Sequence, residues 1–214
     1  MLKKLSIQTF GCKVNQYNSQ LVSQKLKNYF QIESKWKNSD CVIINSCVVT
    51  EKAEREVISL VKKIQKTGIK EIYVMGCTSS ICKKELQTLF VNCFNENDII
   101  DELLKNYKDH QSCDNLVIDG FGKHTRAFVK IQSGCNQFCS YCIVPYVRGP
   151  LVSRSSSSIV REIESLIKNG FKEIVLTGTQ VGLYNDPENS RVFFYELLNI
   201  IGEKFSDSLS RVRI

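Results

Sequence analysis

Two periods of hydrophobic positions alternate along this chain. The stretch "CVIINS" at 41–46 is a continuous apolar run of strand length, which is typical of a strand buried on both faces of a parallel sheet. The stretch "EKAEREVISLVKKIQKTG" at 51–68 places its apolar residues three and four positions apart, which predicts an amphipathic helix that ends at Gly68. Because strands and helices of these two kinds alternate, the sheets are predicted to be parallel.

The same criteria extend this alternation over the chain. The predicted strands lie at 4–10, 41–46, 69–76, 90–94, 125–132 and 171–178, and another begins at 211. The predicted helices lie at 18–30, 51–68, 82–89, 97–106, 155–170 and 191–205.

A polar stretch, "NYKDHQSCDN", followed by the glycine-containing "LVIDGFGKH", interrupts the alternation and reads as a linker. It divides the chain into a domain at 1–118 and a second α/β series at 119–214. The first domain is predicted to be an α/β open parallel sheet with helices on both faces.

Composition narrows the classes of protein that fit. The chain has 214 residues, 43% of them hydrophobic, which is enough for a proper core. No apolar run approaches the ~20 residues of a membrane helix. The start "MLKKLSIQTF" lacks the continuous apolar region of a secretory signal. We therefore expect a cytoplasmic protein that does not associate with membranes.

Cysteine is unusually abundant, with ten residues against two histidines. A reducing compartment does not keep structural disulfides, so clustered cysteines there more often bind metal or do redox chemistry. The scarcity of histidine makes the expected ligands mostly thiolates, which suit an iron–sulfur cluster or a four-cysteine zinc site. The formal charge of +7 is compatible with a polyanionic partner such as RNA, although lysine-rich solvated surfaces give the same charge.

Three cysteines that are far apart in sequence occupy equivalent places in the predicted fold. Cys12, Cys47 and Cys77 each come just after a predicted strand, in "TFGCKVN", "IINSCVVT" and "YVMGCTSS". The carboxyl ends of parallel strands share one edge of a sheet, where ligands bind. We therefore expect these three thiols to meet in one metal site. Four other cysteines have no such placement and are expected to be structural: Cys41, Cys82, Cys93 and Cys113.

A second set is local in sequence. Cys135, Cys139 and Cys142 lie in "SGCNQFCSYCIVPY", on a loop expected to run from 133 to about 150. Three thiolates fit a [4Fe–4S] cluster that leaves one iron without a protein ligand, where a substrate or cofactor can bind. A four-cysteine zinc site typically has two C-x-x-C units, and this loop has only one, at 139–142.

The C-x-x-x-C-x-x-C motif at 135–142, with Tyr141 before its third cysteine, resembles that of the radical S-adenosylmethionine (SAM) superfamily. Together with "TFGCKVNQYNS", "INSCVVTEKAERE" and "VMGC", in this order, it resembles the radical-SAM methylthiotransferases over nearly the whole chain. The resemblance implies that residues 119–214 form the first part of a radical-SAM (β/α) partial barrel.

The resemblance also implies two [4Fe–4S] clusters, one on Cys12, Cys47 and Cys77 and one on Cys135, Cys139 and Cys142. SAM would bind the open iron of the second cluster. Its adenine would lie near Tyr141, and its amino group near Thr177 and Gly178 in "LTGTQVG".

The family's reaction is radical hydrogen abstraction followed by insertion of a methylated sulfur, for which the cofactors supply the hard steps. No general base is required, so no catalytic side chain is assigned, and the sequence does not identify the sulfur donor.

Branches of the family act on isopentenyl-adenosine in tRNA, on threonylcarbamoyl-adenosine in tRNA, or on an aspartate of a ribosomal protein. Lys13, Val14 and Asn15 after the first cysteine most resemble the threonylcarbamoyl branch, which implies the tRNA anticodon loop as partner. Arg148 and Arg154 beside the cluster loop are candidates for phosphate contacts or, equally, for a structural ion pair.

Two other functions stay open. A non-catalytic zinc or iron–sulfur module that binds RNA would account for the cysteines and the charge, but not for an open iron. A thiol redox enzyme using Cys139 and Cys142 would lack a thioredoxin-like setting.

Family members continue beyond the strand that begins at "RVRI", through the rest of the barrel and a small RNA-binding domain. We therefore expect a C-terminally truncated chain, with an unpaired sheet edge, a tendency to aggregate and little activity by itself.

Overall fold

The computed structural model describes residues 2–47, 51–78, 83–89, 91–94, 96–105, 118, 120 and 125–214. The contacts divide the chain into two compact units, Met1–Leu116 and Val117–Ile214. The predicted linker and the residues around the predicted domain boundary at 118/119 lie largely outside the described residues, so that boundary stays a prediction.

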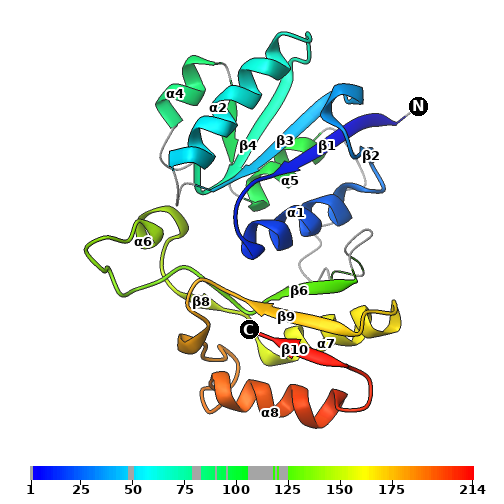
Figure 1. Cartoon of the computed structure of the whole chain (residues 1–214), viewed down its shortest axis with the longest axis vertical. Helices are drawn as coiled ribbons and strands as arrows, with labels where there is room; N and C mark the ends of the chain where they lie inside the picture. The colour runs from blue at the N-terminus through cyan, green and yellow to red at the C-terminus, as the bar shows by residue number, and fades with distance from the viewer. Residues whose placement is uncertain are drawn as a thin grey trace. The chain divides into compact units, whose positions relative to one another are not determined.

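The first unit is built on a five-stranded sheet in the order β2–β1–β3–β4–β5 (Figure 1). Every neighbouring pair of strands is parallel. The sheet confirms the predicted α/β fold class. Its strands are β1 (Lys3–Thr9), β2 (Phe30–Glu33), β3 (Cys41–Ser46), β4 (Glu71–Gly76) and β5 (Asn92–Phe94).

Helices cover both faces of this sheet (Figure 1). Strand β3 is fully buried, and its side chains alternate between two cores. Cys41 and Ile43 pack with helices α1 and α5, whereas Val42 and Ile44 pack with α2 and α4. The helices are α1 (Lys13–Leu26), α2 (Glu51–Gln65), α4 (Lys83–Thr88) and α5 (Glu96–Leu104), and a 3₁₀ turn, η1, spans Trp36–Asn38.

The helix predicted at 18–30 is wrong at both ends. Helix α1 begins at Lys13, directly after Cys12, because Val14 and Tyr17 extend its buried stripe toward the N-terminus. Phe30 belongs instead to β2, where it pairs with Lys3 and is buried in the core. Pairing with a distant strand overrides the local helical pattern at these residues.

The second unit has a three-stranded parallel sheet in the order β10–β9–β6 (Figure 1). Helices α7 and α8 run alongside it and bury apolar stripes that include Ile163 and Leu197. The strands are β6 (Arg126–Lys130), β9 (Glu173–Thr177) and β10 (Arg211–Arg213), and the helices α7 (Ser156–Lys168) and α8 (Phe194–Phe205). A 3₁₀ turn, η2 (Val181–Leu183), follows β9.

The long loop after β6 is more ordered than its sequence predicts. It contains a two-residue antiparallel pairing of β7 (Gln132–Ser133) with β8 (Val152–Ser153), and the short helix α6 (Val144–Arg148). The pairing closes the loop at its base, so its two ends are held together.

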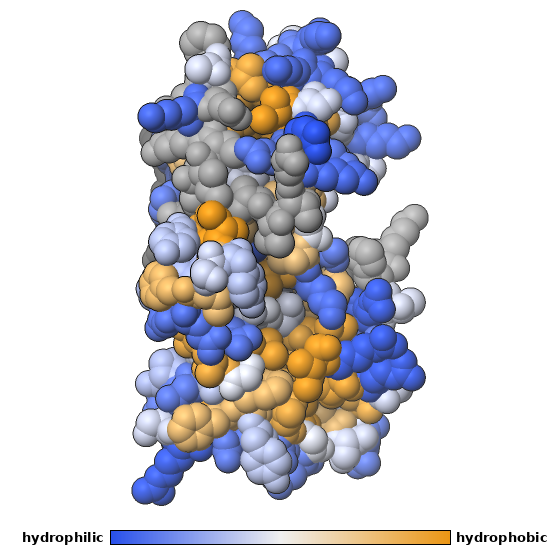
Figure 2. All heavy atoms as spheres, turned by 60° about the vertical axis from the view of Figure 1, so that its left-hand side comes forward, coloured by the Kyte–Doolittle hydropathy of each residue, from blue (hydrophilic) through white to orange (hydrophobic). Residues whose placement is uncertain are grey.

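Hydrophobic residues also reach the surface of the molecule, where they lie among hydrophilic ones (Figure 2). Tyr141 and Tyr146 of the cysteine loop and Val152 of β8 are examples in the second unit. In the part of the chain that the structure describes, no helix is both long enough and apolar enough to cross a membrane.

Candidate functional site

The three cysteines of the first unit follow three neighbouring strands. Cys12 comes after β1 and occupies the N-cap position of α1, Cys47 directly follows β3, and Cys77 directly follows β4. Because β1, β3 and β4 are adjacent and parallel, all three lie at the carboxyl edge of one sheet. In this strand order the connections reverse direction between β1 and β3, where ligands bind in such folds. We call these residues the sheet-edge cysteines.

A close backbone approach links two of these turns. Gly11 has φ of +99°, and a Cβ built there would lie 2.3 Å from Cβ of Cys47. Only glycine fits this position, because any side chain would be strained and would overlap Cys47. The turn that carries Cys12 is thereby brought against the turn that carries Cys47.

Asn45, two residues before Cys47, links β3 to helix α1, which follows Cys12, and lies close to Gly76, which precedes Cys77. Its fully buried side-chain amide donates hydrogen bonds to the backbone oxygen of Asn15, at 2.8 Å, and to Oγ of Ser19, at 2.9 Å. Its Oδ1 faces Gly76, where a Cβ would come within 2.5 Å of it. Asn15 in turn donates to the backbone oxygen of Phe10 at 2.9 Å. The prediction from sequence missed Asn45, whose one signal is a polar residue inside an apolar strand.

The sheet-edge cysteines differ in exposure. Cys12 is exposed, whereas Cys47 and Cys77 are 6% and 2% exposed. All three are thiols, the donors that iron–sulfur clusters prefer. Within the described residues, no three His, Cys, Asp or Glu side chains are grouped closely enough to hold a metal ion. The thiol chemistry of the donor set fits an iron–sulfur cluster, but in the described residues these thiols are not gathered as the ligands of one metal site.

The three cysteines of the second unit, which we call the loop cysteines, lie between β7 and α6. The backbone N–H of Cys135 donates to the oxygen of Gly149 at 3.2 Å, and that of Cys142 to the oxygen of Cys139 at 2.9 Å. Gly134 has φ of +73°, and a Cβ there would lie 1.9 Å from the backbone oxygen of Pro150. Glycine is therefore required where the loop begins. All three loop cysteines are partly exposed thiols.

Gln132 joins the cysteine loop to the turn after β9. Its buried side chain donates to the oxygen of Gly134 at 2.5 Å and accepts from the backbone N–H of Gln180 at 2.8 Å. A Cβ on Gly178 would come within 2.9 Å of Gln132 Oε1. Two of the predicted SAM-binding residues, Thr177 at the end of β9 and Gly178 in the turn after it, thus lie where Gln132 joins this turn to the loop. Sequence analysis did not identify Gln132, because it reads as one residue of a strand.

Tyr141, the predicted neighbour of the SAM adenine, is 91% exposed, so its ring is open to a ligand. Phe138 and Tyr146 are also exposed and meet edge to face with their centroids 5.8 Å apart. Phe138 has φ of +46°, the only positive value for a residue other than glycine in the described part of the chain. The loop therefore presents aromatic rings beside its thiols.

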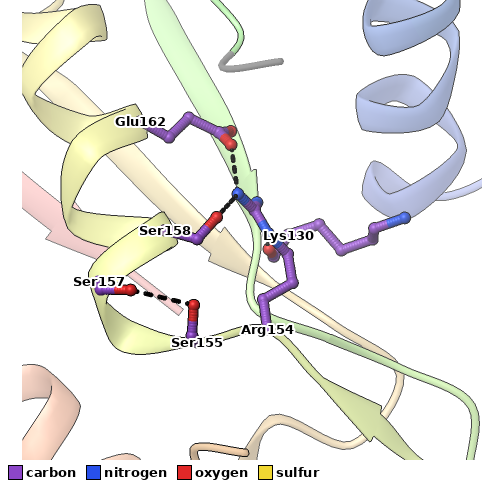
Figure 3. A network of polar contacts seen from close by, with 6 residues as sticks. All are labelled: Lys130, Arg154, Ser155, Ser157, Ser158 and Glu162. Carbon is purple, nitrogen blue, oxygen red and sulfur yellow. Dashed lines mark hydrogen bonds and ion pairs between the residues drawn. The ribbon is translucent and has the colours of Figure 1, made fainter. Parts of the chain in front are cut away.

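Arg154 lies inside the second unit and holds the base of the cysteine loop (Figure 3). Its guanidinium donates to Glu162 Oε2 at 2.7 Å, to Ser158 Oγ at 2.9 Å and to the backbone oxygen of Lys130 at 2.8 Å. Glu162 is fully buried. Of the two roles predicted for Arg154, these contacts support the structural ion pair rather than a phosphate contact. Arg148 is partly exposed in α6, and its phosphate role stays a prediction.

The cysteines expected to be structural fall into two groups. Cys41 is fully buried in β3, and burial together with the nearby Glu71 carboxylate raises its pKa to about 12. Such a thiol is inert, which agrees with a structural role. Cys93 is half-buried in β5. Cys82 and Cys113 lie outside the described residues.

Two sequence families match successive parts of the chain. Residues 4–95 match the uncharacterized protein family UPF0004, and residues 129–206 match the radical SAM superfamily. The chain belongs to the radical-SAM methylthiotransferase family.

Relatives within this family include methylthiotransferases of two types. The chain is 32% identical to a tRNA-2-methylthio-N(6)-dimethylallyladenosine synthase of Pelagibacter ubique, matching 100% of this chain and 53% of the relative. It is 33% identical to a threonylcarbamoyladenosine tRNA methylthiotransferase of Chlamydia pneumoniae, with 95% and 48% covered. A putative methylthiotransferase of Helicobacter pylori is 34% identical, with 100% and 52% covered. The chain spans about half the length of the curated relatives it matches.

Solved structures of other radical SAM enzymes have a fold similar to that of this chain. The radical SAM methyltransferase TsrM from Kitasatospora setae, with cobalamin and a [4Fe-4S] cluster bound, superposes with a TM-score of 0.68 at 12% identity, over 97% of this chain and 54% of that one. The cobalamin-dependent radical enzyme OxsB gives a TM-score of 0.57 at 10% identity, over 99% and 38%. At these identities the likeness concerns the fold alone, and it confirms the predicted radical-SAM architecture.

Proposed function

We propose that the protein carrying this chain transfers a methylthio group to a modified adenosine of tRNA, using two [4Fe–4S] clusters and SAM. The observation that carries the proposal is the placement of two cysteine triads. The sheet-edge cysteines follow three adjacent parallel strands, and the loop cysteines form the C-x-x-x-C-x-x-C motif after β7. Relatives that match 95% or more of this chain are named as tRNA methylthiotransferases.

The proposed ligands of the first cluster are Cys12, Cys47 and Cys77, and those of the second are Cys135, Cys139 and Cys142. When bound, the clusters and SAM supply electron transfer, radical formation and sulfur. The protein's own residues position these groups. Gly11 and Asn45 hold the sheet-edge turns together, and Gln132 fixes the loop against Thr177 and Gly178. The exposed ring of Tyr141 offers a stacking surface for the adenine of SAM.

We further propose threonylcarbamoyl-adenosine, in the anticodon loop, as the substrate. The sequence after the first cysteine, Lys13, Val14 and Asn15, carries this assignment. Val14 and Asn15 are buried, and Asn15 is engaged with Phe10 and Asn45, so Lys13 alone of the three is exposed to a ligand. A tRNA substrate also implies a cytoplasmic location. Both types of tRNA enzyme occur among the relatives, so the choice rests on experiment.

The test of the reaction class is anaerobic reconstitution, with iron and sulfide, of the protein that carries this chain. Two four-iron clusters correspond to about eight irons per chain, and we expect 5′-deoxyadenosine to form from SAM under reducing conditions. Replacing the loop cysteines with alanine should remove about four irons and abolish SAM cleavage. Replacing the sheet-edge cysteines should remove about four irons and leave SAM cleavage in place. Bound zinc without SAM cleavage would instead identify a non-catalytic module.

The test of the substrate is mass spectrometry of tRNA nucleosides from cells with and without the gene. We expect the methylthio form of threonylcarbamoyl-adenosine to disappear and that of isopentenyl-adenosine to persist. The opposite result would assign the other tRNA branch. No change in either nucleoside would contradict a tRNA substrate and direct the search to the ribosomal protein.

A further inference from the structure

Helix α2 carries a stripe of basic side chains along its solvent-facing side. The members recur at spacings of three, four and seven residues, which place them on one side of an α-helix. All are exposed, and Ser59 lies among them. The stripe, which we call the α2 basic stripe, consists of Lys52, Arg55, Lys62, Lys63 and Lys66.

The surface along this stripe is hollowed. A depression of about 440 Å³ is lined by Arg55, Ile58, Ser59 and three lysines, without a carboxylate. A second depression of about 410 Å³ continues along the helix toward Lys52 and Phe10. Its lining includes one acid, Glu56, whose Oε1 is 4.0 Å from Nζ of Lys52. The stripe is therefore a nearly uniform positive surface.

The stability of the helix accounts for only some of these charges. Lys62 and Lys63 lie in its last turn, where cations complement the helix dipole. Lys52 and Arg55 lie near its N-terminus, where cations oppose the dipole. Lys66 lies one residue beyond the helix, and it repels Lys62, a like charge four residues away. An anionic partner would offset the repulsion between these neighbouring cations.

The length of the stripe indicates which kind of anionic partner fits it. Lys52 and Lys66 are 14 residues apart, which corresponds to about 21 Å of helix. This length exceeds one phosphate group and suits a repeating polyanion. A helix that lies on a membrane exposes its apolar face to lipid, but Val57, Val61 and Ile64 of α2 are buried against the sheet. A lipid surface therefore fits less well.

We propose that the α2 basic stripe binds the phosphate backbone of RNA. The inference rests on the proposed function for the identity of that RNA, which is tRNA. Phosphate contacts give affinity and orientation without sequence readout. The stripe thus holds the RNA in place, and the net charge of +7 favours its approach.

The experiment measures binding of a fluorescently labelled anticodon stem-loop transcript to the chain by anisotropy, from about 50 to 200 mM salt. The stripe variant is Lys62→Gln, Lys63→Gln and Lys66→Gln. The matched control is Lys35→Gln, Lys168→Gln and Lys172→Gln, which removes the same charge from other exposed positions. Glutamine is nearly as good a helix former as lysine, so α2 should stay folded, as circular dichroism will verify.

Each lost phosphate contact should reduce the slope of log affinity against log salt by about one. We expect the stripe variant to lose two to three units of slope and at least about tenfold in affinity near 0.1 M salt. The control should change by less than about threefold, through net charge alone. Equal losses in both variants, or no RNA binding by the original chain, would overturn the proposal.

Two further measurements separate this inference from others. Sedimentation with vesicles of phosphatidylserine and phosphatidylcholine tests a lipid partner. Binding to vesicles that depends on Lys62, Lys63 and Lys66, without binding to RNA, would overturn the RNA assignment. SAM cleavage requires no RNA, so a chain that cleaves SAM but binds RNA equally well without the stripe would retain the proposed enzyme class and lose this surface.

Discussion

The sheet-edge cysteines and the loop cysteines are positioned in different ways. The first set spans residues 12–77 and comes from three turns, so its geometry depends on strand pairing across the sheet. The second set spans residues 135–142 and lies in one loop, whose backbone hydrogen bonds are mostly short in sequence range. A ligand set of the first kind is only as stable as the unit that carries it, whereas a set of the second kind depends on the loop's own closure.

The cysteine loop also depends on contacts outside its own residues. The loop is closed at its base by the pairing of β7 with β8, and Arg154 follows β8 directly. Arg154 also accepts at its backbone oxygen a hydrogen bond from the Tyr184 hydroxyl, at 2.8 Å. Burial, followed by the nearby Asp186 carboxylate, raises the pKa of Tyr184, which therefore stays a neutral donor. The local set thus has one anchor in the core of its unit.

Breaking this anchor should give the largest effect. Arg154→Met leaves the fully buried Glu162 without its cation, and such a loss typically costs about 3–5 kcal/mol. Urea unfolding, followed by hydrogen exchange in each unit, should show the loss in the second unit only. The double variant Arg154→Met, Glu162→Leu should recover most of it, because no charge is left buried.

The exposed pair of Lys204 and Glu164 is the control for this variant. Lys204→Gln should leave the stability of the second unit nearly unchanged, as for most surface ion pairs. If Arg154→Met instead leaves the second unit stable but weakens RNA binding, Arg154 is a phosphate ligand and the anchor interpretation is wrong.

Two glycine substitutions compare the sets directly. Gly134→Ala would place a Cβ 1.9 Å from a backbone oxygen, and Gly11→Ala would place one 2.3 Å from Cβ of Cys47. Strain and overlap together should cost roughly 2–4 kcal/mol in each case. After reconstitution, Gly134→Ala should lack the iron bound by the loop cysteines, and Gly11→Ala the iron bound by the sheet-edge cysteines.

Gly182→Ala serves as the neutral control, since a Cβ there meets nothing within 4 Å. Loss of both clusters in either variant would show that the two sets do not assemble independently. Normal iron content in Gly11→Ala would contradict the role of the close approach to Cys47.

Asn45→Ala should sharpen the comparison with a smaller effect. It removes the hydrogen bonds to Asn15 and Ser19 inside the first unit, and about 1–3 kcal/mol is typical for such a buried loss. Hydrogen exchange should increase in the turns at Cys12 and Cys47 and remain unchanged in the second unit. Asn38→Ala, at an exposed position, is the matched control. If exchange at these turns is unaffected, Asn45 does not connect them.

The smallest effect is a dependence of the second unit on pH. Burial raises the pKa of Asp186, but hydrogen bonds from Ser156, Glu188 and Asn189 outweigh it and lower the pKa below its usual value of 3.8. A lowered folded-state pKa gives stability that is present above the usual value and is lost as pH falls through the folded value.

Lowering the pH below about 4 should therefore destabilise the second unit progressively, which thermal unfolding will measure. Asp186→Asn should make the stability of this unit less dependent on pH in that range. An unchanged acid profile in Asp186→Asn would assign the dependence to other carboxylates.

The alternation of apolar periods was sufficient to predict the parallel α/β class, as β3 shows. Its apolar run from Cys41 to Ile44 predicts a strand buried on both faces, and the structure buries all six residues of the strand. The ligand set of Cys135, Cys139 and Cys142 could also be predicted from the sequence, because its members lie within eight residues of one another. Neither inference depends on knowing which segments become neighbours.

Only the structure shows the features that depend on contacts between segments far apart in sequence. Phe30 left the predicted helix because pairing with Lys3 in a parallel strand buries it, and no local pattern encodes that pairing. Asn45 and Gln132 read as strand residues, and only the fold shows that their side chains tie separate turns together. Sequence thus determined the elements and their chemistry, because periodicity and motif spacing act over a few residues. Tertiary structure determined the contacts that position this chemistry, because hydrogen bonds and close packing act between residues that the chain itself keeps far apart.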